Sequence, residues 1–203
     1  MKILCIGRNY ADHISELNNE RPSEPVIFLK PDTAILKDNE PFYHPDFSND
    51  IHYEVEIVLK INKVGKNIEA KFAHKYYDEI GIGIDFTARD LQTKLKEKGL
   101  PWEKAKAFDG SAPISGFIKK TNFGDLGNLK FHLEINGDSR QNGNTNMMLW
   151  NFDEIIAEIS KYFTLKTGDL IFTGTPAGVG KVYIGDKLTA FIEDDELLAF
   201  EIK

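Results

Sequence analysis

Cysteine is nearly absent from this chain of 203 residues, which has one, Cys5. A single thiol cannot form an internal disulfide, and it leaves no second cysteine for a CxxC redox motif or a zinc ribbon. We therefore expect a protein of a reducing compartment, in which Cys5 is a small core residue of the first strand.

Long apolar runs are missing as well. The first seven residues are mostly apolar but turn polar at Arg8, before they reach the roughly 7 to 15 apolar residues of a signal-peptide core. No run approaches the roughly 18 apolar residues that span a bilayer. We therefore expect a soluble, cytoplasmic protein without a membrane partner.

Basic charge is not in surplus, because 25 Lys and Arg stand against 32 Asp and Glu, a formal net charge of −7. Lys94, Lys96 and Lys98 are interleaved with Glu97, so no basic stripe follows a phosphate backbone, and we expect no nucleic-acid partner. Repeats and linkers rich in Pro, Gly or Ser are also missing. The length therefore predicts a single domain over residues 1–203.

Short segments of β-type pattern dominate the chain, separated by Gly, Asn and Asp. Regular alternation of strands and helices is lacking, which argues against a doubly wound parallel sheet and favours a strand-rich α+β fold. Residues 142–144 (NGN) are typical of a turn. The expected strands are residues 51–60, 129–136, 170–173, 187–193 and 197–202.

Two helices have start signals. Thr87 with Asp90 three residues later is similar to a capping box and predicts a helix over residues 88–98. Asn151 with Glu154 gives the same signal for a second helix.

Carboxylates carry the first chemical signal. Glu54 and Glu56 alternate with apolar residues, and side chains at i and i+2 of a strand point to one face, about 7 Å apart. Asp85 follows the glycine-spaced apolar run 80–84, which predicts a third carboxylate at the end of a buried strand. Three such oxygen ligands favour Mg²⁺ or Mn²⁺ over zinc. The alternatives are an exposed strand face for the pair and a helix cap for Asp85.

His13 and Glu16 carry the second signal, because residues three apart share one side of a helical turn, here expected over residues 12–17. The carboxylate can orient the imidazole and raise its basicity, which is typical of a general base that activates water. The alternative is an ordinary surface contact.

Six stretches then resemble one family, the fumarylacetoacetate hydrolase family in its small single-domain form, closest to its acylpyruvase and oxaloacetate decarboxylase branch. The chain begins at the strand before the first stretch, so we expect it to lack the extra N-terminal domain of fumarylacetoacetate hydrolase itself and to take another substrate. In chain order the stretches are GRNY (7–10) with His13 and Glu16, FLKP (28–31), HYEVE (52–56), DFTARD (85–90), KAFD (106–109) and GDLIFTGTP (168–176).

The resemblance implies a mixed β-roll of the family's C-terminal-domain type, assembled as a homodimer. It implies Mg²⁺ or Mn²⁺ held by Glu54, Glu56 and Asp85. His13 and Glu16 would activate water from a lid that orders over the substrate. Lys106 would lie beside the metal. The residues implied in substrate binding are Arg8, Lys30, Gln92 and Thr175.

The implied activity is Mg²⁺-dependent hydrolysis of a carbon–carbon bond in acylpyruvate-like β-diketo acids, through a metal-stabilised enolate. A small-molecule 2-oxoacid is the expected partner. Two alternatives use the same site: decarboxylation of a 2-oxo diacid, or isomerisation of the 2-hydroxyhepta-2,4-diene-1,7-dioate type. A third, of another class, is a protein that binds a metal and a small acid without turnover.

Overall fold

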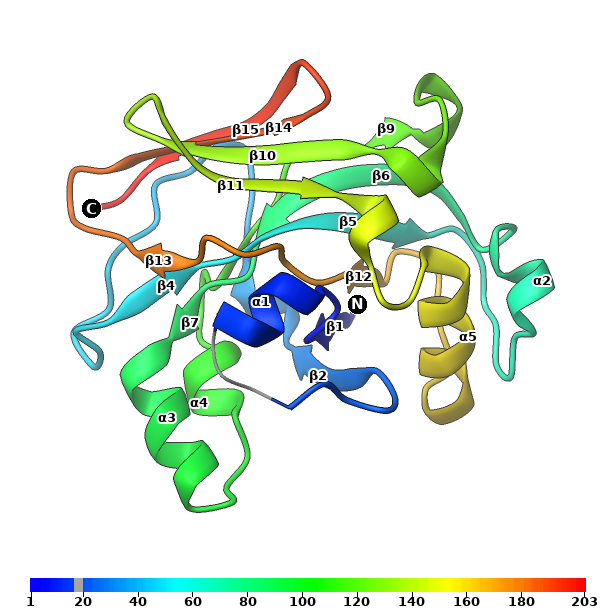
Figure 1. Cartoon of the computed structure of the whole chain (residues 1–203), viewed down its shortest axis with the longest axis horizontal. Coiled ribbons are helices and arrows are strands. Elements are labelled where there is room, and N and C mark those ends of the chain that lie inside the picture. Colours follow the sequence, from blue (N-terminus) through cyan, green and yellow to red (C-terminus); the bar gives the residue numbers. More distant parts are fainter. Residues whose placement is uncertain (17–19) are drawn as a thin grey trace.

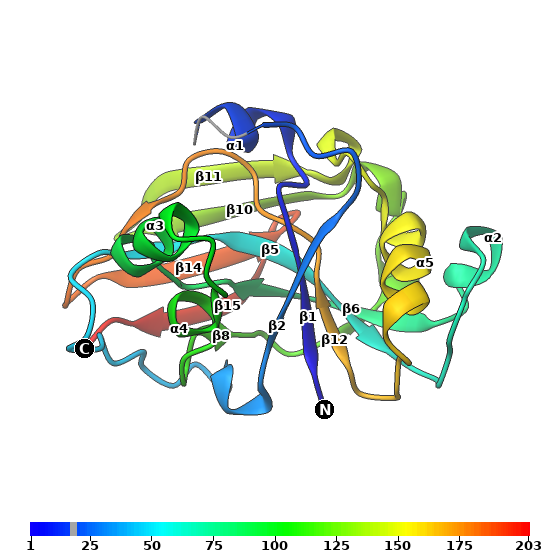
Figure 2. The same ribbon diagram turned by 90° about the horizontal axis from the view of Figure 1, so that it is seen from below.

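A computed structural model describes residues 1–16 and 20–203 of the chain (Figures 1 and 2). Its central sheet is mixed, because β1 pairs in parallel with β12 while the other neighbours are antiparallel. Among the described residues this sheet has six strands, in the order β2 (Val26–Lys30), β1 (Ile3–Gly7), β12 (Leu170–Phe172), β5 (Val55–Ile61), β6 (Tyr77–Ile84) and β9 (Ile118–Lys119).

A second, antiparallel sheet lies above β5 and β6 in Figure 1. Its strand order is β11 (Asp138–Asn144), β10 (Lys130–Ile135), β14 (Lys187–Ile192) and β15 (Asp195–Glu201). Apolar side chains of both sheets form one core, including Ile57 and Ile82 from the central sheet and Leu133 and Leu188 from the second. The short strands form two small sheets, β13 (Gly180–Lys181), β4 (Ile51–Tyr53) and β7 (Thr87–Ala88), and β3 (Ile35–Leu36) with β8 (Ala112–Pro113).

The helices are short and lie around the sheets; α3 and α5 are on opposite sides of the molecule, and β1 runs from the N-terminus toward α1 (Figure 2). None of the helices in the described part of the chain is both long and apolar enough to cross a membrane. The helices are α1 (Ala11–Glu16), α2 (Ala70–Ala73), α3 (Arg89–Glu97), α4 (Glu103–Lys106) and α5 (Phe152–Tyr162), with single 3₁₀ turns at Asp32–Ala34, Lys120–Asn122, Leu126–Asn128 and Thr145–Met147.

The prediction of a strand-rich α+β fold is confirmed. Cys5 is buried in β1, as expected. The helical turn predicted at residues 12–17 is α1, although Leu17 lies outside the described residues. The capping box of α5 is confirmed, since Asn151 accepts from the Glu154 amide and Glu154 accepts from the Asn151 amide.

Three local predictions are wrong. Residues 142–144 are not a turn but part of β11, where Asn142 lies opposite His132. The predicted strand 51–60 is interrupted at Glu54, because β4 and β5 belong to different sheets. Thr87 does not cap α3: it pairs with His52 in the small β4–β7 ladder.

Candidate active site

The three predicted carboxylates meet at one point of the fold. Glu54 lies between β4 and β5, Glu56 lies on β5, and Asp85 follows β6 directly. The Asp85 amide donates to the Glu54 carbonyl at 2.8 Å, which joins the two strand ends. One oxygen from each carboxylate lies within 4.8 Å of the others, and all three residues are buried.

Two buried lysines neutralise part of this charge. Lys106 Nζ donates to Glu54 Oε2 at 2.9 Å and to Asp85 Oδ2 at 2.6 Å. Lys30 Nζ lies 2.7 Å from Asp85 Oδ1 and donates to the Ser111 carbonyl at 2.8 Å. The structure therefore places Lys30 behind Asp85 rather than on the wall of the cavity, and its predicted contact with substrate stays a prediction.

The lysines and an arginine set the charge states on one side of the cluster. Burial raises the pKa of Glu54, but the Lys106 ammonium and the Arg89 guanidinium outweigh burial and hold that pKa below its usual range. Burial lowers the pKa of Lys106, and the Asp85 and Glu54 carboxylates reverse this, so its pKa is raised. At neutral pH Glu54 and Lys106 are therefore both ionised.

Glu56 is in the opposite situation. Its Oε2 accepts from the Gly174 amide at 2.7 Å, but no ammonium or guanidinium group of the described residues forms an ion pair with it. Burial, followed by the charges of Asp85 and Glu54, raises its pKa well above the usual range. A divalent cation would remove this repulsion, and an all-carboxylate donor set suits Mg²⁺ or Mn²⁺. The residues therefore fit the metal that the sequence implies.

The predicted histidine–glutamate pair lies on α1. His13 Nδ1 is 3.3 Å from Glu16 Oε2, and Glu16 Oε1 also accepts from the Gly178 amide at 3.1 Å. His13 is 6% exposed and lines the same cavity as the three carboxylates. Because Glu16 contacts Nδ1, Nε2 is the ring nitrogen left for a bound molecule.

The lining side chains almost fill the cavity, which has a free volume of about 50 Å³. This space suits one or two waters, so a small organic acid can enter only if some lining side chains move. The structure brings eight of the predicted site residues to this cavity, and their individual roles stay predictions. They are Arg8, His13, Glu54, Glu56, Asp85, Gln92, Lys106 and Thr175.

Cationic groups that the sequence reasoning missed also line the cavity. Arg89 Nη2 donates to Glu54 Oε1 at 2.5 Å, and Nη1 donates to Gln92 Oε1 at 2.7 Å. The buried Arg89 Nε–H has no hydrogen-bond partner among the described residues. The pKa of Lys96 is lowered, by burial and then by the charges of Arg8 and Arg89. Arg89 lies within the DFTARD motif, and its place in that motif could have identified it as a site residue. No motif includes Lys96.

Thr87 and Gln141 were missed as well. Thr87 Oγ1 donates to Glu54 Oε1 at 3.0 Å, which explains why its side chain is not available to cap α3. Gln141 is completely buried on β11 and contacts Thr175 of the cavity. Because a turn was predicted at residues 142–144, the strand β11, which positions Gln141, was not predicted.

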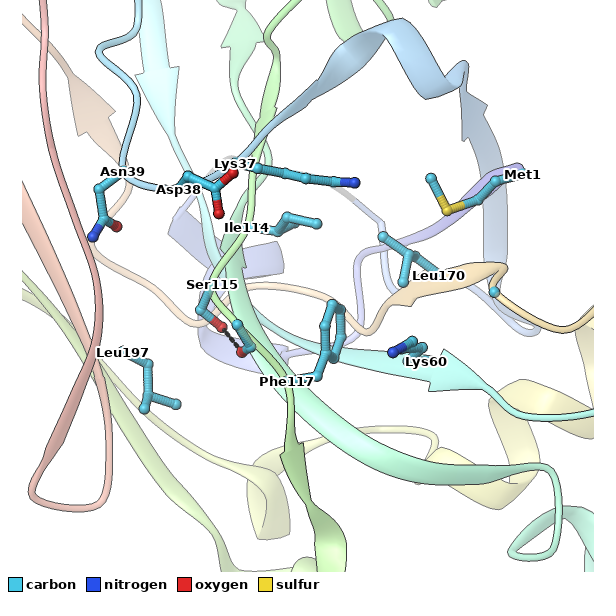
Figure 3. A pocket seen from close by; sticks show the side chains of 12 residues that line it. Met1, Lys37, Asp38, Asn39, Lys60, Ile114, Ser115, Phe117, Leu170 and Leu197 are labelled. Atoms are coloured by element: carbon cyan, nitrogen blue, oxygen red, sulfur yellow. Dashed lines mark hydrogen bonds between the residues drawn. The ribbon is translucent and has the colours of Figure 1, made fainter.

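A larger cavity, of about 480 Å³, opens elsewhere (Figure 3). Figure 3 shows Lys37 reaching across it toward Met1. Two of its polar side chains are already engaged, since Lys60 Nζ lies 2.7 Å from Glu79 Oε2 and Ser115 Oγ donates to the Gly116 carbonyl at 2.6 Å. It has neither a histidine nor a carboxylate cluster in its lining, so the chemistry lies in the smaller cavity.

Fold and cavity together define a strand-rich α+β protein with a buried carboxylate site suited to a divalent cation. The chain belongs to the fumarylacetoacetate hydrolase family, because the family profile "Fumarylacetoacetate (FAA) hydrolase C-terminal" matches residues 2–203. The predicted family and its fold are thereby confirmed.

The names of similar proteins indicate which reactions occur in this family. Oxaloacetate tautomerase YcgM of Escherichia coli is 43% identical over 197 residues, covering 97% of this chain and 90% of that protein. A mitochondrial oxaloacetate decarboxylase of Dictyostelium discoideum is 45% identical over 185 residues, covering 91% and 85%. Fumarylpyruvate hydrolase from Pseudomonas aeruginosa, solved with Mn²⁺ and pyruvate, superposes with a TM-score of 0.94 at 34% identity, covering 100% of this chain and 89% of that one. These relatives are enzymes of oxoacids. The sequence predicts hydrolase, decarboxylase or isomerase chemistry, but not the interconversion of keto and enol forms in particular.

Proposed function

We propose that this chain is a divalent-cation-dependent enzyme that interconverts the enol and keto forms of oxaloacetate, a four-carbon 2-oxo diacid. The observation that carries the proposal is the lining of the cavity, which combines three carboxylates, one histidine base and a group of cationic side chains. The identity to the E. coli tautomerase, 43% over 97% of this chain, supports the same reaction.

The cationic groups favour a diacid over a monoacid. Arg8, Arg89 and Lys96 line the cavity, and the lowered pKa of Lys96 reflects burial and the repulsion among them. A second carboxylate on the substrate would relieve this repulsion, and it would offer an acceptor for the Arg89 Nε–H. Acetylpyruvate has one carboxylate and brings no second negative charge to this group of cations. Oxaloacetate is therefore the better match.

The reaction removes the proton from the enol oxygen on C2 and adds a proton at C3. Glu16 holds His13 at Nδ1, so that Nε2 can accept the proton that leaves the enol oxygen and, as the imidazolium, deliver it to C3, or carry it in the reverse direction. The Lys106 ammonium, beside Glu54 and Asp85, stabilises negative charge on the C2 oxygen. A divalent cation held by Glu54, Glu56 and Asp85 would supply Lewis-acid polarisation of the 2-oxo group.

Hydrolysis of acylpyruvates is the second candidate, and the His13–Glu16 pair favours it because the same base can activate water. Decarboxylation of oxaloacetate needs no base and would use the remaining groups of the cavity. Metal and acid binding without turnover is the remaining alternative. The homodimer, the cytoplasmic location and the lack of a nucleic-acid partner stay predictions.

The test compares the activity on oxaloacetate with the activity on acetylpyruvate, and it removes one charge of the cavity, that of Lys96. With Mn²⁺ present, we expect the protein to accelerate the loss of enol absorbance of oxaloacetate more than the release of pyruvate from acetylpyruvate. We expect Lys96→Gln to raise KM for oxaloacetate about fivefold, because a rim charge that faces a carboxylate contributes modestly. Acetylpyruvate turnover should not change.

Lys94→Gln is the matched control, because Lys94 is an exposed lysine of the same helix that does not line the cavity. Faster turnover of acetylpyruvate than of oxaloacetate would favour the hydrolase. An equal effect of both lysine variants on KM would remove the charge argument for a diacid.

A further inference from the structure

We propose that Gln141 is a positioning residue, which fixes the Thr175 hydroxyl as a hydrogen-bond donor toward an anionic oxygen of the bound substrate. The inference rests on the proposed function only in taking a carboxylic acid as the ligand. Gln141 itself does not line the cavity, so it would act through Thr175.

Three hydrogen bonds determine how the buried Gln141 amide is oriented. Its Oε1 accepts from the Val55 amide at 2.9 Å. Its Nε2 donates to Thr175 Oγ1 at 2.9 Å and to the Pro176 carbonyl at 2.9 Å. A flipped amide would place NH₂ against the Val55 N–H and oxygen against the Pro176 oxygen, which are two repulsive contacts. The amide hydrogens therefore face Thr175 and Pro176.

This orientation decides what the Thr175 hydroxyl can do. A hydroxyl has one hydrogen to donate and two lone pairs. Because Gln141 donates to Thr175 Oγ1, the hydroxyl hydrogen does not point at Gln141, and no acceptor among the described residues takes it. Thr175 is 3% exposed and faces the cavity that holds Glu54, Glu56 and Asp85. The free hydrogen is therefore available to a ligand, and a carboxylate or enolate oxygen is the matching acceptor.

The same amide also connects two parts of the site. Val55 lies between Glu54 and Glu56, and Thr175 and Pro176 follow β12. Gln141 is thus bonded to the carboxylate strand through its oxygen and to the threonine segment through its nitrogen. If Gln141 were only structural, it would do no more than connect these two segments. The test therefore has to separate this connection from the direction in which the Thr175 hydroxyl donates its hydrogen.

Two substitutions of Gln141 separate these roles. Gln141→Glu keeps the shape and the acceptor for Val55, but the introduced carboxylate accepts the Thr175 hydrogen and withdraws it from the ligand. Gln141→Met removes every hydrogen bond of the side chain, which costs more stability, yet leaves the Thr175 hydrogen free. Positioning therefore predicts that the Glu variant binds ligand less well than the Met variant, whereas the Met variant unfolds at the lower temperature.

The measurement is calorimetric binding of oxalate to Mn²⁺-loaded protein, together with thermal unfolding and a Mn²⁺ titration of each variant. We expect Gln141→Glu and Thr175→Val each to weaken oxalate binding about 10- to 100-fold, the range of a hydrogen bond to a charged group. The double variant should be no weaker than either single variant, because both changes remove the same donor. Mn²⁺ affinity should change far less than oxalate affinity.

Ser160→Ala serves as the control, since Ser160 is a buried hydroxyl bonded to the Ile68 amide and the Ala157 carbonyl and does not line the cavity. It should lower Tm without changing oxalate binding. The inference is overturned if Gln141→Met weakens oxalate binding as much as Gln141→Glu, or if the two losses multiply in the double variant. If wild-type protein does not convert oxaloacetate but the variants keep the expected order for oxalate, the proposed function fails and the role of Gln141 stands.

Discussion

We expect Glu56→Gln to unfold at a higher temperature than the wild type when metal ions are removed, and to lose metal-dependent activity. Burial and the neighbouring Asp85 and Glu54 carboxylates raise the pKa of Glu56 in the folded protein. A carboxyl group with a raised folded pKa destabilises the fold once the pH is above its unfolded pKa, so a neutral amide removes this cost at neutral pH. The amide oxygen still accepts from the Gly174 amide.

The same substitution removes one of the three proposed metal ligands. We expect Mn²⁺ affinity to fall at least about a hundredfold. This exceeds the loss that is usual when the substituted residue only hydrogen-bonds to a metal ligand. Activity at moderate Mn²⁺ should fall correspondingly. Each kcal/mol gained by the metal-free protein should raise Tm by about 2–4 °C.

Glu54→Gln is the matched comparison and should shift Tm in the opposite direction. Lys106 and Arg89 hold the pKa of Glu54 below its usual range, so its charge stabilises the fold above that pKa. Its loss removes the carboxylate partner of Arg89 and leaves Lys106 with Asp85 alone. Thermal unfolding of both variants, in EDTA and in Mn²⁺, provides the measurement. A lower metal-free Tm for Glu56→Gln, or a preserved rise in Tm with Mn²⁺, would contradict our interpretation of this site.

His13→Ala should lower kcat for the interconversion of enol and keto oxaloacetate about 10²- to 10⁴-fold, the usual contribution of a positioned general base. Mn²⁺ binding should persist, because His13 is not among the three metal ligands assigned here. Decarboxylation of oxaloacetate should persist too, because loss of CO₂ needs no base at C3. Enol absorbance and pyruvate release, followed on the same sample, separate the two reactions.

Glu16→Gln should have a smaller effect than His13→Ala, because the amide can still contact His13 Nδ1 and the Gly178 amide. We expect a loss of kcat of about tenfold, because the neutral amide orients the imidazole less firmly than the carboxylate does. Equal kcat in wild type and His13→Ala would exclude His13 as the base and leave the carboxylates and Lys106 to account for catalysis.

The two capping signals in the sequence had different outcomes: the one at Asn151 is correct and the one at Thr87 is not. Asn151 and Glu154 satisfy backbone groups within their own turn, so the capping box forms without help from the rest of the fold. Thr87 has the same spacing to Asp90, but the ladder with His52 directs its hydroxyl to Glu54. Asp90 instead accepts from Ser48 at 2.7 Å. A tertiary contact therefore replaced the local cap.

The polar strand β11 shows why residues 142–144 were misinterpreted. Asn142 and Asn144 lie on an edge strand of the second sheet, where polar side chains remain in water, so no apolar alternation marks the strand. Gly143 is needed there because a Cβ would lie 2.4 Å from the Phe131 ring. The same residues, Asn-Gly-Asn, are also typical of a turn, so composition alone cannot distinguish this strand from a turn.

The site was predictable to the extent that its residues are neighbours in sequence. Glu54 and Glu56 are two apart on a strand, and His13 and Glu16 are three apart on a helix, so spacing predicts that each pair shares one face. Their function followed from the family resemblance. Gln141 is 86 residues from Val55, and an isolated glutamine carries no periodic signal. Its place became visible only with the fold.

The most direct test of the account is the rate of enol oxaloacetate loss as Mn²⁺ is added to metal-free protein, measured against the same Mn²⁺ without protein. We expect no acceleration in EDTA and a rate that rises with Mn²⁺ and saturates at one ion per chain. Full activity in EDTA would contradict it, as would stoichiometric Mn²⁺ binding without acceleration over the protein-free control.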